Sequence, residues 1–198
     1  MYRVYGMAES GNCYKVKLLL SQLKQPFEWI ETDIMQGKSR TSEFLAKNPN
    51  GKVPTLEISP GVYLPESNAI LCYLAEGSPY WPADRLARAR VMQWMFFEQY
   101  SHEPYVAVAR FILLLLKQPN HPDLAEKQRR SHLAFAVMEQ HLAKELFFVG
   151  GQYSIADIAL FAYTHVADDG GLDLAPYPAI RAWIEQVKAQ PDYVPIGD

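Results

Sequence analysis

The stretch "NPNGKVPTLEI", residues 48–58, decides how the first third of the chain is interpreted. Residues 55–58 alternate between polar and apolar types, which is typical of a half-buried strand. Pro54 stands at the entrance of that strand and cannot donate a backbone hydrogen bond. Because proline is the residue for which a cis peptide costs little, Val53–Pro54 is either a cis junction or a trans proline on an edge strand.

The segment "ESNAI", which begins 13 residues after Val53, favours the cis junction. A cis bond can leave the Val53 N–H and C=O outside the sheet, where an extended peptide can pair with them. Glu66 and Ser67 stand at the start of a predicted helix, and helix N-termini bind carboxylates. The Glu66 carboxylate can hold an ammonium group as well. Together these residues predict a peptide-like ligand with an amino-acid head.

Outward from this stretch, residues 1–76 mix strand and helix patterns. Residues 2–7, 27–34, 55–58 and 63–66 have the composition of strands. Residues 13–25, 42–48 and 67–77 have the pattern of helices; in the first, an apolar stripe leaves Lys15, Lys17 and Lys24 mostly on other faces. The order β-α-β-α-β-β-α predicts an α/β sandwich on a small mixed sheet.

Residues 77–84 form a linker rich in turn formers, and residues 85–198 are predicted to be an all-α domain. A long helical stretch covers residues 86–116 and is interrupted or bent near Pro104, and further helices are expected within 122–146, 154–167 and 178–190. Ser154 and Asp157 make a capping box, which Tyr153 and Ile158 flank as a hydrophobic staple. This pattern predicts a well-specified helix start without a role in catalysis.

Composition excludes several classes of protein. The 198 residues are 49% hydrophobic and 21% charged, with a formal net charge of −3 and scattered basic residues, so no nucleic-acid partner is expected. Two cysteines without a C-x-x-C pair or a Cys/His cluster predict no metal site. The run "FILLLL" is too short to span a membrane, and the first residues lack the pattern of a signal peptide, so we expect a cytoplasmic protein.

The motifs in combination resemble the cytosolic glutathione transferase family, and the resemblance covers nearly the whole chain. It is carried by "NGKVPTL", "ESNAILCYLAE", "SIADI" and "YPAIRAWIEQV". The resemblance implies the glutathione-transferase fold, with a thioredoxin-like domain over residues 1–76 that binds glutathione. The helical domain would then supply most of a hydrophobic pocket for a second, electrophilic substrate. The family is usually a homodimer.

The resemblance also assigns roles to residues of this chain. Val53, beside Pro54, would pair with the cysteinyl backbone of glutathione, and Glu66 and Ser67 would hold its γ-glutamyl head. Lys52 and Arg40 would meet its glycine carboxylate, because lysine and arginine are natural partners of carboxylates. The alternative for Lys52 and Arg40 is a solvated surface cation.

The catalytic group must stabilise the thiolate of bound glutathione, and the loop after the first strand, "MAESGNCYK", is where it is expected. Ser10 in "S-G-N" is similar to the serine of theta-like and other bacterial classes. Asn12 is its helper or replacement, although both are also favoured helix caps. Tyr5 is a weaker candidate because it lies in the strand rather than in the loop. In related classes that use a redox cysteine, the cysteine occupies the position of Ser10, and Cys13 lies three residues after that position.

The predicted activity is attack of the glutathione thiolate on small hydrophobic electrophiles, as in detoxification, and the same constellation allows reduction of peroxides or disulfides. Two alternatives stay open. The first is a non-catalytic glutathione-binding or regulatory protein of the same fold, and the second is a dedicated glutathione-dependent isomerase or dehalogenase. His102 and Tyr105, near Pro104, are either pocket-lining residues or packing residues.

Overall fold

The structure is a computed structural model that describes residues 1–197. The chain divides into two compact units. The first comprises residues 1–78 together with the C-terminal segment that begins at Pro191, and the second comprises Pro79–Gln190.

The first unit is built on a four-stranded mixed sheet with the order β2-β1-β3-β4. The strands are β1 (Tyr2–Gly6), β2 (Phe27–Glu31), β3 (Thr55–Ser59) and β4 (Val62–Pro65). β1 runs parallel to β2 and antiparallel to β3, and β3 runs antiparallel to β4. A crossover helix joins the parallel pair, whereas a tight turn joins β3 and β4.

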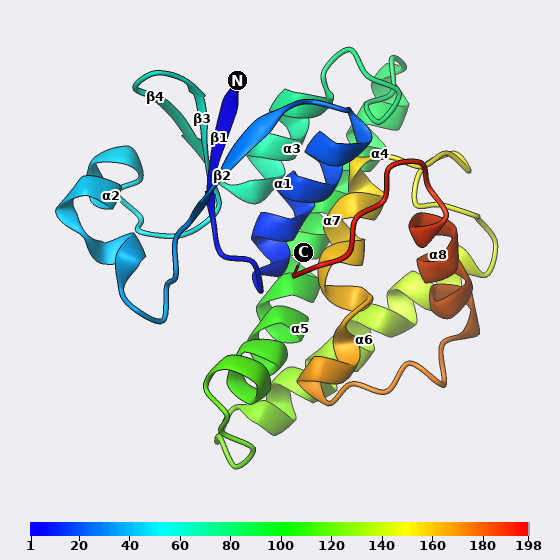
Figure 1. Cartoon of the computed structure of the whole chain (residues 1–198). Coiled ribbons are helices and arrows are strands. Elements are labelled where there is room, and N and C mark those ends of the chain that lie inside the picture. The colour runs from blue at the N-terminus through cyan, green and yellow to red at the C-terminus, as the bar shows by residue number, and fades with distance from the viewer. Residues whose placement is uncertain (198) are drawn as a thin grey trace. The chain divides into compact units, whose positions relative to one another are not determined.

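Helices α1 (Gly11–Gln22) and α3 (Ser67–Ala75) lie side by side on one face of the sheet, and α2 (Ser42–Lys47), after the short 3-10 helix η1 (Lys38–Arg40), lies on the other (Figure 1). Alternation along β1 explains the two faces. Val4 is fully buried, while the ring of Tyr5 packs edge-on against Phe44 of α2 at 6.3 Å. The predicted β-α-β-α-β-β-α order and the α/β sandwich are confirmed.

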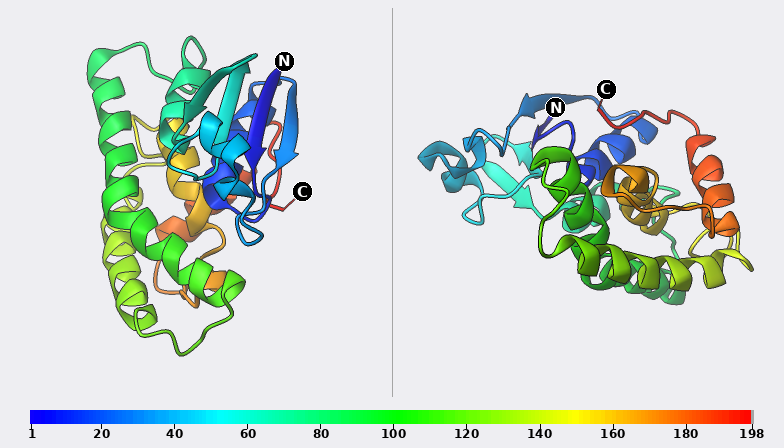
Figure 2. Two further views of the ribbon diagram at one scale, coloured as in Figure 1. Left: turned by 90° about the vertical axis from the view of Figure 1, so that its left-hand side faces the viewer. Right: turned by 90° about the horizontal axis from the view of Figure 1, so that it is seen from below.

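The second unit is helical, as predicted (Figure 2). α7 is buried at every residue and contacts α4, α5 and α8, so it forms the centre of this unit. An isolated bridge joins Val149 and Gln152. The elements are α4 (Arg85–Phe97), η2 (Glu98–His102), α5 (Glu103–Arg110), η3 (Phe111–Leu115), α6 (Leu124–Leu142), α7 (Ile155–Thr164), η4 (Ala167–Gly170) and α8 (Pro178–Lys188).

The interruption expected near Pro104 is a π-helical segment, η2, which ends just before that proline. The N–H of Glu103 donates to Glu98 five residues back, and Pro104 itself has no N–H to donate. A second π-helical segment, η3, follows α5 and was not predicted. Wide turns of this kind carry no clear sequence pattern, which is why the sequence indicated only a bend.

The capping box at the start of α7 is confirmed. Ser154 accepts from the N–H of Ala156, while the Asp157 carboxylate accepts from the N–H of Ser154 at 2.9 Å. Asp157 also accepts from the N–H of Phe148 and from the indole N–H of Trp183, at 3.1 and 3.0 Å. One fully buried carboxylate therefore fixes α7, the preceding loop and α8 together.

The C-terminal segment differs from the predicted domain boundary, which placed all of residues 85–198 in the helical domain. Residues from Pro191 onward belong to the first unit. There the Tyr14 hydroxyl donates to the C=O of Val194 at 2.8 Å, and the Ser21 hydroxyl donates to the C=O of Asp192 at 2.9 Å. These contacts join α1 to residues more than 170 positions away, so no local pattern could indicate them.

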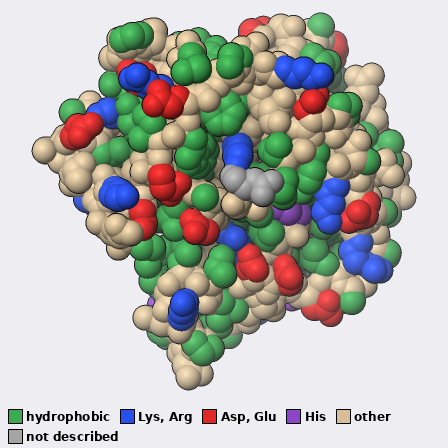
Figure 3. Space-filling view, viewed as in Figure 1, with side chains coloured by type: hydrophobic (Ala, Val, Ile, Leu, Met, Phe, Trp, Pro, Cys, Tyr) green, Lys and Arg blue, Asp and Glu red, His purple; other side chains and the backbone are tan. Residues whose placement is uncertain are grey.

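Charged side chains on the face shown in Figure 3 are scattered, with basic and acidic ones interspersed. Among residues 1–197, no helix has the length and apolar character needed to cross a membrane. Within the same range, no group of three or more histidine, cysteine, aspartate or glutamate side chains is arranged to hold a metal ion.

Candidate functional site

Strand register brings three separate segments to one edge of the sheet. Thr55, at the start of β3, pairs with Tyr5 near the end of β1 and with Pro65 at the end of β4. The loop that follows β1 contains Ser10, the junction that precedes β3 contains Val53–Pro54, and Glu66 directly follows β4. The segments that contain Ser10, Val53–Pro54 and Glu66 therefore follow or precede strand ends at this one edge, because of the antiparallel pairing.

Ser10 is the N-cap of α1 and is half-buried. Its Oγ accepts from the N–H of Cys13 at 3.4 Å. The expected capping role is therefore present. A hydroxyl that accepts one hydrogen bond still carries its own proton, so Ser10 can donate to a second group at the same time.

Asn12 lies beside Ser10 but contacts the start of α3. Its Oδ1 accepts from the Ser67 hydroxyl at 3.2 Å and from the ammonium of Lys15 at 2.8 Å. Lys15 was predicted to lie off the apolar face of its helix, but it is fully buried between α1 and α3. Helical periodicity did not predict this burial, because the residues of α3 that contact Lys15 are 52 and 53 positions away in the sequence.

The Val53–Pro54 peptide is cis, as the context of the sequence favoured. Outside helices and strands, none of the backbone hydrogen bonds of residues 1–197 involves Val53. The side chain of Asn48, a residue that sequence reasoning missed, supports this junction. Its amide donates to the C=O of Lys52 at 2.8 Å and to Thr55 Oγ1 at 3.2 Å.

Lys52 and Arg40 are both exposed, but Arg40 has a contact within the protein. Its guanidinium donates to the C=O of Asn50 at 3.2 Å. A Cβ added to Gly51, whose φ is +64°, would lie 2.6 Å from the Arg40 side chain. The left-handed backbone at Gly51 therefore favours glycine in this turn, and Arg40 braces the turn that leads to Val53.

The start of α3 has an unusual backbone. Glu66 has φ +70°, a left-handed value that is uncommon for residues other than glycine, and it is exposed. No side chain caps α3, and the Ser67 hydroxyl donates to Asn12. Strained backbone of this kind concentrates at ligand-binding sites. The first turn of α3 also carries the partial positive charge of a helix N-terminus.

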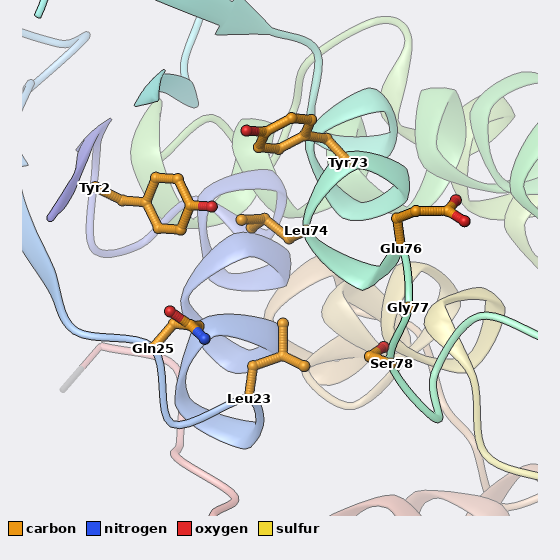
Figure 4. Close-up of a pocket in the computed structure, with 8 residues that line it drawn as sticks. All are labelled: Tyr2, Leu23, Gln25, Tyr73, Leu74, Glu76, Gly77 and Ser78. Atoms are coloured by element: carbon orange, nitrogen blue, oxygen red, sulfur yellow. The ribbon is translucent and has the colours of Figure 1, made fainter. Parts of the chain in front are cut away.

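The Tyr5 side chain points to the face of the sheet that α2 covers, opposite to the face covered by α1 and α3. Its hydroxyl donates to Glu57 at 3.1 Å, and burial, followed by this hydrogen bond, raises the pKa of Tyr5 to about 12. Tyr2 contributes to a pocket of about 440 Å³ at the far ends of α1 and α3 (Figure 4). None of the eight residues lining that pocket is a predicted site residue, so it is separate from the edge described above.

The cysteines have environments of low reactivity. Cys13 is fully buried, and burial raises the pKa of its thiol to about 12. Burial also raises the pKa of Cys72. Because the thiolate is the nucleophile, a raised pKa argues against redox chemistry at Cys13.

The two candidates of the helical unit, His102 and Tyr105, make packing contacts. His102 is fully buried and its Nε2 lies 2.9 Å from the hydroxyl of Thr164 on α7. The Tyr105 hydroxyl accepts from Arg130 on α6 at 2.9 Å. These contacts join η2 to α7 and α5 to α6.

The edge described above can therefore offer the Ser10 hydroxyl beside the N-terminus of α1. It also offers the uncapped N-terminus of α3 with the Glu66 carboxylate, and the backbone N–H and C=O of Val53 at the entrance of β3. Those groups suit a ligand with a thiol, an extended peptide backbone and an amino-acid head.

Both halves of the chain resemble known proteins. Residues 4–80 match the glutathione S-transferase N-terminal domain and residues 93–191 match the glutathione S-transferase C-terminal domain. Glutathione S-transferase GstB of Escherichia coli K12 is 30% identical over 96% of this chain and 95% of its own length. Disulfide-bond oxidoreductase YfcG of the same strain is 28% identical over 93% of this chain and 89% of its own length.

Solved structures extend the likeness to the whole chain. A glutathione S-transferase from Pseudomonas fluorescens Pf-5 is 53% identical with a TM-score of 0.97, over 100% of this chain and 99% of that one. Ure2p in complex with S-p-nitrobenzylglutathione is 25% identical with a TM-score of 0.86, over 96% of this chain and 91% of that one. On its fold, its domain matches and its relatives, this chain belongs to the glutathione S-transferase family.

Proposed function

We propose that this protein binds glutathione at the common edge of its sheet and directs the thiolate against small hydrophobic electrophiles. The observation that carries the proposal is the strand register, which gathers Ser10, the Val53–Pro54 junction and the Glu66–Ser67 helix start at one place. Family membership supports glutathione as the co-substrate.

In this proposal the γ-glutamyl head binds at the start of α3. The exposed Glu66 carboxylate pairs with the ligand's ammonium, and the first turn of α3 with Ser67 receives its carboxylate. The cysteinyl backbone pairs with the N–H and C=O of Val53. Lys52 meets the glycine carboxylate. Arg40 has more N–H groups than its contact with Asn50 uses, so it can meet the same carboxylate.

The chemical role falls to Ser10. A free thiol with a pKa of about 8.5 is mostly protonated at neutral pH. A hydrogen bond from the Ser10 hydroxyl and the N-terminus of α1 stabilise the thiolate and lower that pKa. With an aryl halide, the sulfur forms a bond to the ring carbon, the carbon–halogen bond breaks, halide leaves, and the thiol proton passes to solvent.

The test compares two helix N-caps, Ser10 of α1 and Thr41 of α2. Ser10 and Thr41 each accept from an N–H three residues on, so Ser10→Ala and Thr41→Ala remove the same capping contact. Only Ser10→Ala should lower turnover of a model aryl halide, by roughly 10- to 1000-fold, because only Ser10 lies at the site. Equal activities of the two variants would refute the assignment. Retention on immobilised glutathione without turnover by the wild type would favour the non-catalytic alternative.

A second candidate function is disulfide reduction, which the likeness to YfcG favours. The glutathione thiolate would attack a disulfide sulfur, form a mixed disulfide and release a thiolate, and a second glutathione would then yield glutathione disulfide. The buried Cys13 has no part in this route. Rates with 2-hydroxyethyl disulfide and with an aryl halide, measured on the same preparation, decide which activity dominates.

We further propose that the protein is a homodimer. Large apolar side chains are exposed on α4, η2 and α6, and η2 contacts α6. Apolar surface of this kind marks contacts with other proteins. Light scattering on the wild type and on Leu133→Glu tests this proposal, and a monomeric wild type would refute it. The exposed side chains are Phe96, Tyr100, Leu133 and Val137.

A further inference from the structure

The far ends of α1 and α3 form the pocket shown in Figure 4. Its volume of about 440 Å³ lies within the range of sites that take small organic ligands. All of its lining residues belong to the first unit, and the function proposed above gives the pocket no role. Half of the lining is aromatic or aliphatic, from Tyr2, Leu23, Tyr73 and Leu74, and its polar residues include Gln25 and Ser78.

Two helix C-termini meet at this pocket. Leu23 and Glu76, the residues that directly follow α1 and α3, both line it. The first turns of the same two helices are joined at the other end by the contact between Asn12 and Ser67, so the helices run in one direction. The last carbonyl groups of a helix have no N–H partner within it and carry a partial negative charge. The pocket therefore receives partial negative charge from both helices.

Basic residues do not offset this charge from within the helices. Neither α1 nor α3 has a basic residue in its last turn, whereas α2 and α8 do. Lys24, which lies between two lining residues, forms an ion pair with Asp192 at 3.2 Å. None of the eight lining residues is lysine or arginine, and the charged one, Glu76, is a carboxylate. A positively charged ligand therefore meets no cation in the lining.

Two tyrosine rings add to the preference for a cation. Tyr2 of β1 and Tyr73 of α3 both line the pocket, and their hydroxyls are hydrogen-bonded to each other. Burial, followed by the proximity of Tyr73, raises the pKa of Tyr2, so its ring stays neutral. The faces of neutral tyrosine rings attract cations, and organic ammonium groups are the familiar ligands of such rings. Leu23 and Leu74 offer apolar surface to the rest of such a ligand (Figure 4).

We propose that this pocket binds a small organic cation, an alkyl- or arylammonium ion. Its charged group lies near the C-termini of α1 and α3, and its apolar part contacts Leu23, Leu74 and the tyrosine rings. The pocket and the glutathione edge lie at opposite ends of these two helices and share no residue. The inference therefore does not depend on the proposed function.

The test titrates the full chain with benzyltrimethylammonium and, separately, with benzylsulfonate, an anion that carries the same ring. Amide NMR signals, recorded at equal ionic strength, report both the affinity and the place of binding. The signals of residues 23–25 and 76–78 should move most as the cation is added. The cation should bind at least about tenfold more tightly than the anion, because the helix C-termini and the rings favour one sign of charge.

Two substitutions change the lining itself. Gln25→Lys places a cation at an exposed position of the pocket, and Tyr73→Ala removes one ring from a side chain that is 44% exposed. Gln25→Lys should weaken benzyltrimethylammonium at least about tenfold, and Tyr73→Ala about fivefold. Gln186→Lys is the matched control, since it adds the same charge at an exposed position of α8 and should leave the affinity unchanged.

Several results would overturn the inference. They are the absence of any shift at roughly 20 mM benzyltrimethylammonium, shifts centred on other residues, and equal binding of benzylsulfonate. A folded Gln25→Lys protein that binds the cation as tightly as Gln186→Lys does would overturn it as well. The comparison of cation with anion uses the wild type, so it decides the question whether or not a variant folds.

Discussion

Replacement of the buried Asp157 carboxylate gives the largest stability effect that we expect in this protein. Asp157 is fully buried and accepts from three N–H groups, on Ser154, Phe148 and Trp183. Asp157→Ala leaves all three donors buried without that acceptor. At about 1–3 kcal/mol for each, the free energy of unfolding should fall by roughly 3–9 kcal/mol.

Asp157→Asn is the graded comparison. Its amide oxygen can still accept from Phe148 and Trp183, but its NH₂ group faces the N–H of Ser154, which loses an acceptor. The expected loss is about 2–5 kcal/mol, between that of Asp157→Ala and the ~1 kcal/mol expected when Ser154→Ala removes only the cap hydroxyl. Urea denaturation at pH 7 gives all three values. An Asp157→Ala protein within 1 kcal/mol of the wild type would refute this account of the buried carboxylate.

The same carboxylate predicts a pH dependence of defined sign. Burial raises the pKa of Asp157 to about 6, against the opposing effect of its hydrogen-bond donors. Between about pH 4 and pH 6 the folded chain holds a proton there that the unfolded chain releases. That contribution is complete below the unfolded pKa and is lost as the pH rises through 6.

The difference between the folded Asp157 pKa of about 6 and its ordinary value of 3.8 corresponds to about 3 kcal/mol. Because Asp157→Asn cannot titrate, the difference in unfolding free energy between it and the wild type isolates this group. The wild type should gain about 2.4 kcal/mol relative to the variant between pH 7 and pH 4. A wild type that loses stability relative to the variant over that range would mean that the donors outweigh burial.

Three further predictions concern the first unit. Asn48→Ala should lower the free energy of unfolding by about 2–4 kcal/mol and weaken glutathione binding, because the loop through Lys52 loses its support; unchanged affinity by calorimetry would contradict this. Cys13, as the sole thiol of a Cys72→Ser protein, should react with a thiol reagent only after denaturation, since its thiol is buried with a pKa of about 12; rapid labelling of the native protein would be inconsistent with that. Tyr5→Phe should keep its kcat within twofold and lose about 1 kcal/mol of stability, and a tenfold loss of kcat would point to a catalytic role that its contact with Glu57 does not suggest.

The fold could be predicted where its causes are local. The α7 capping box and the β1 and β3 alternation are local patterns, and each predicted element is present. Three features depend instead on contacts between distant residues: the burial of Lys15, the support from Asn48, and the return of the C-terminal segment to α1. Asn48 alone left a signal, since an asparagine before proline in "NPNG" is typical of a structured turn.

Ser10 and Ser67 show why the site was harder to predict than the fold. A serine at a helix start satisfies N–H groups, and the same N–H groups and hydroxyl satisfy an anionic ligand, so local sequence gives both roles one pattern. Ser10 does cap its helix, whereas Ser67 does not cap α3 and donates to Asn12 across 55 residues. A hydroxyl at a helix start that bonds to another element is free of the capping role. The contact between helix starts, rather than the serine itself, is therefore the feature that points to a ligand site.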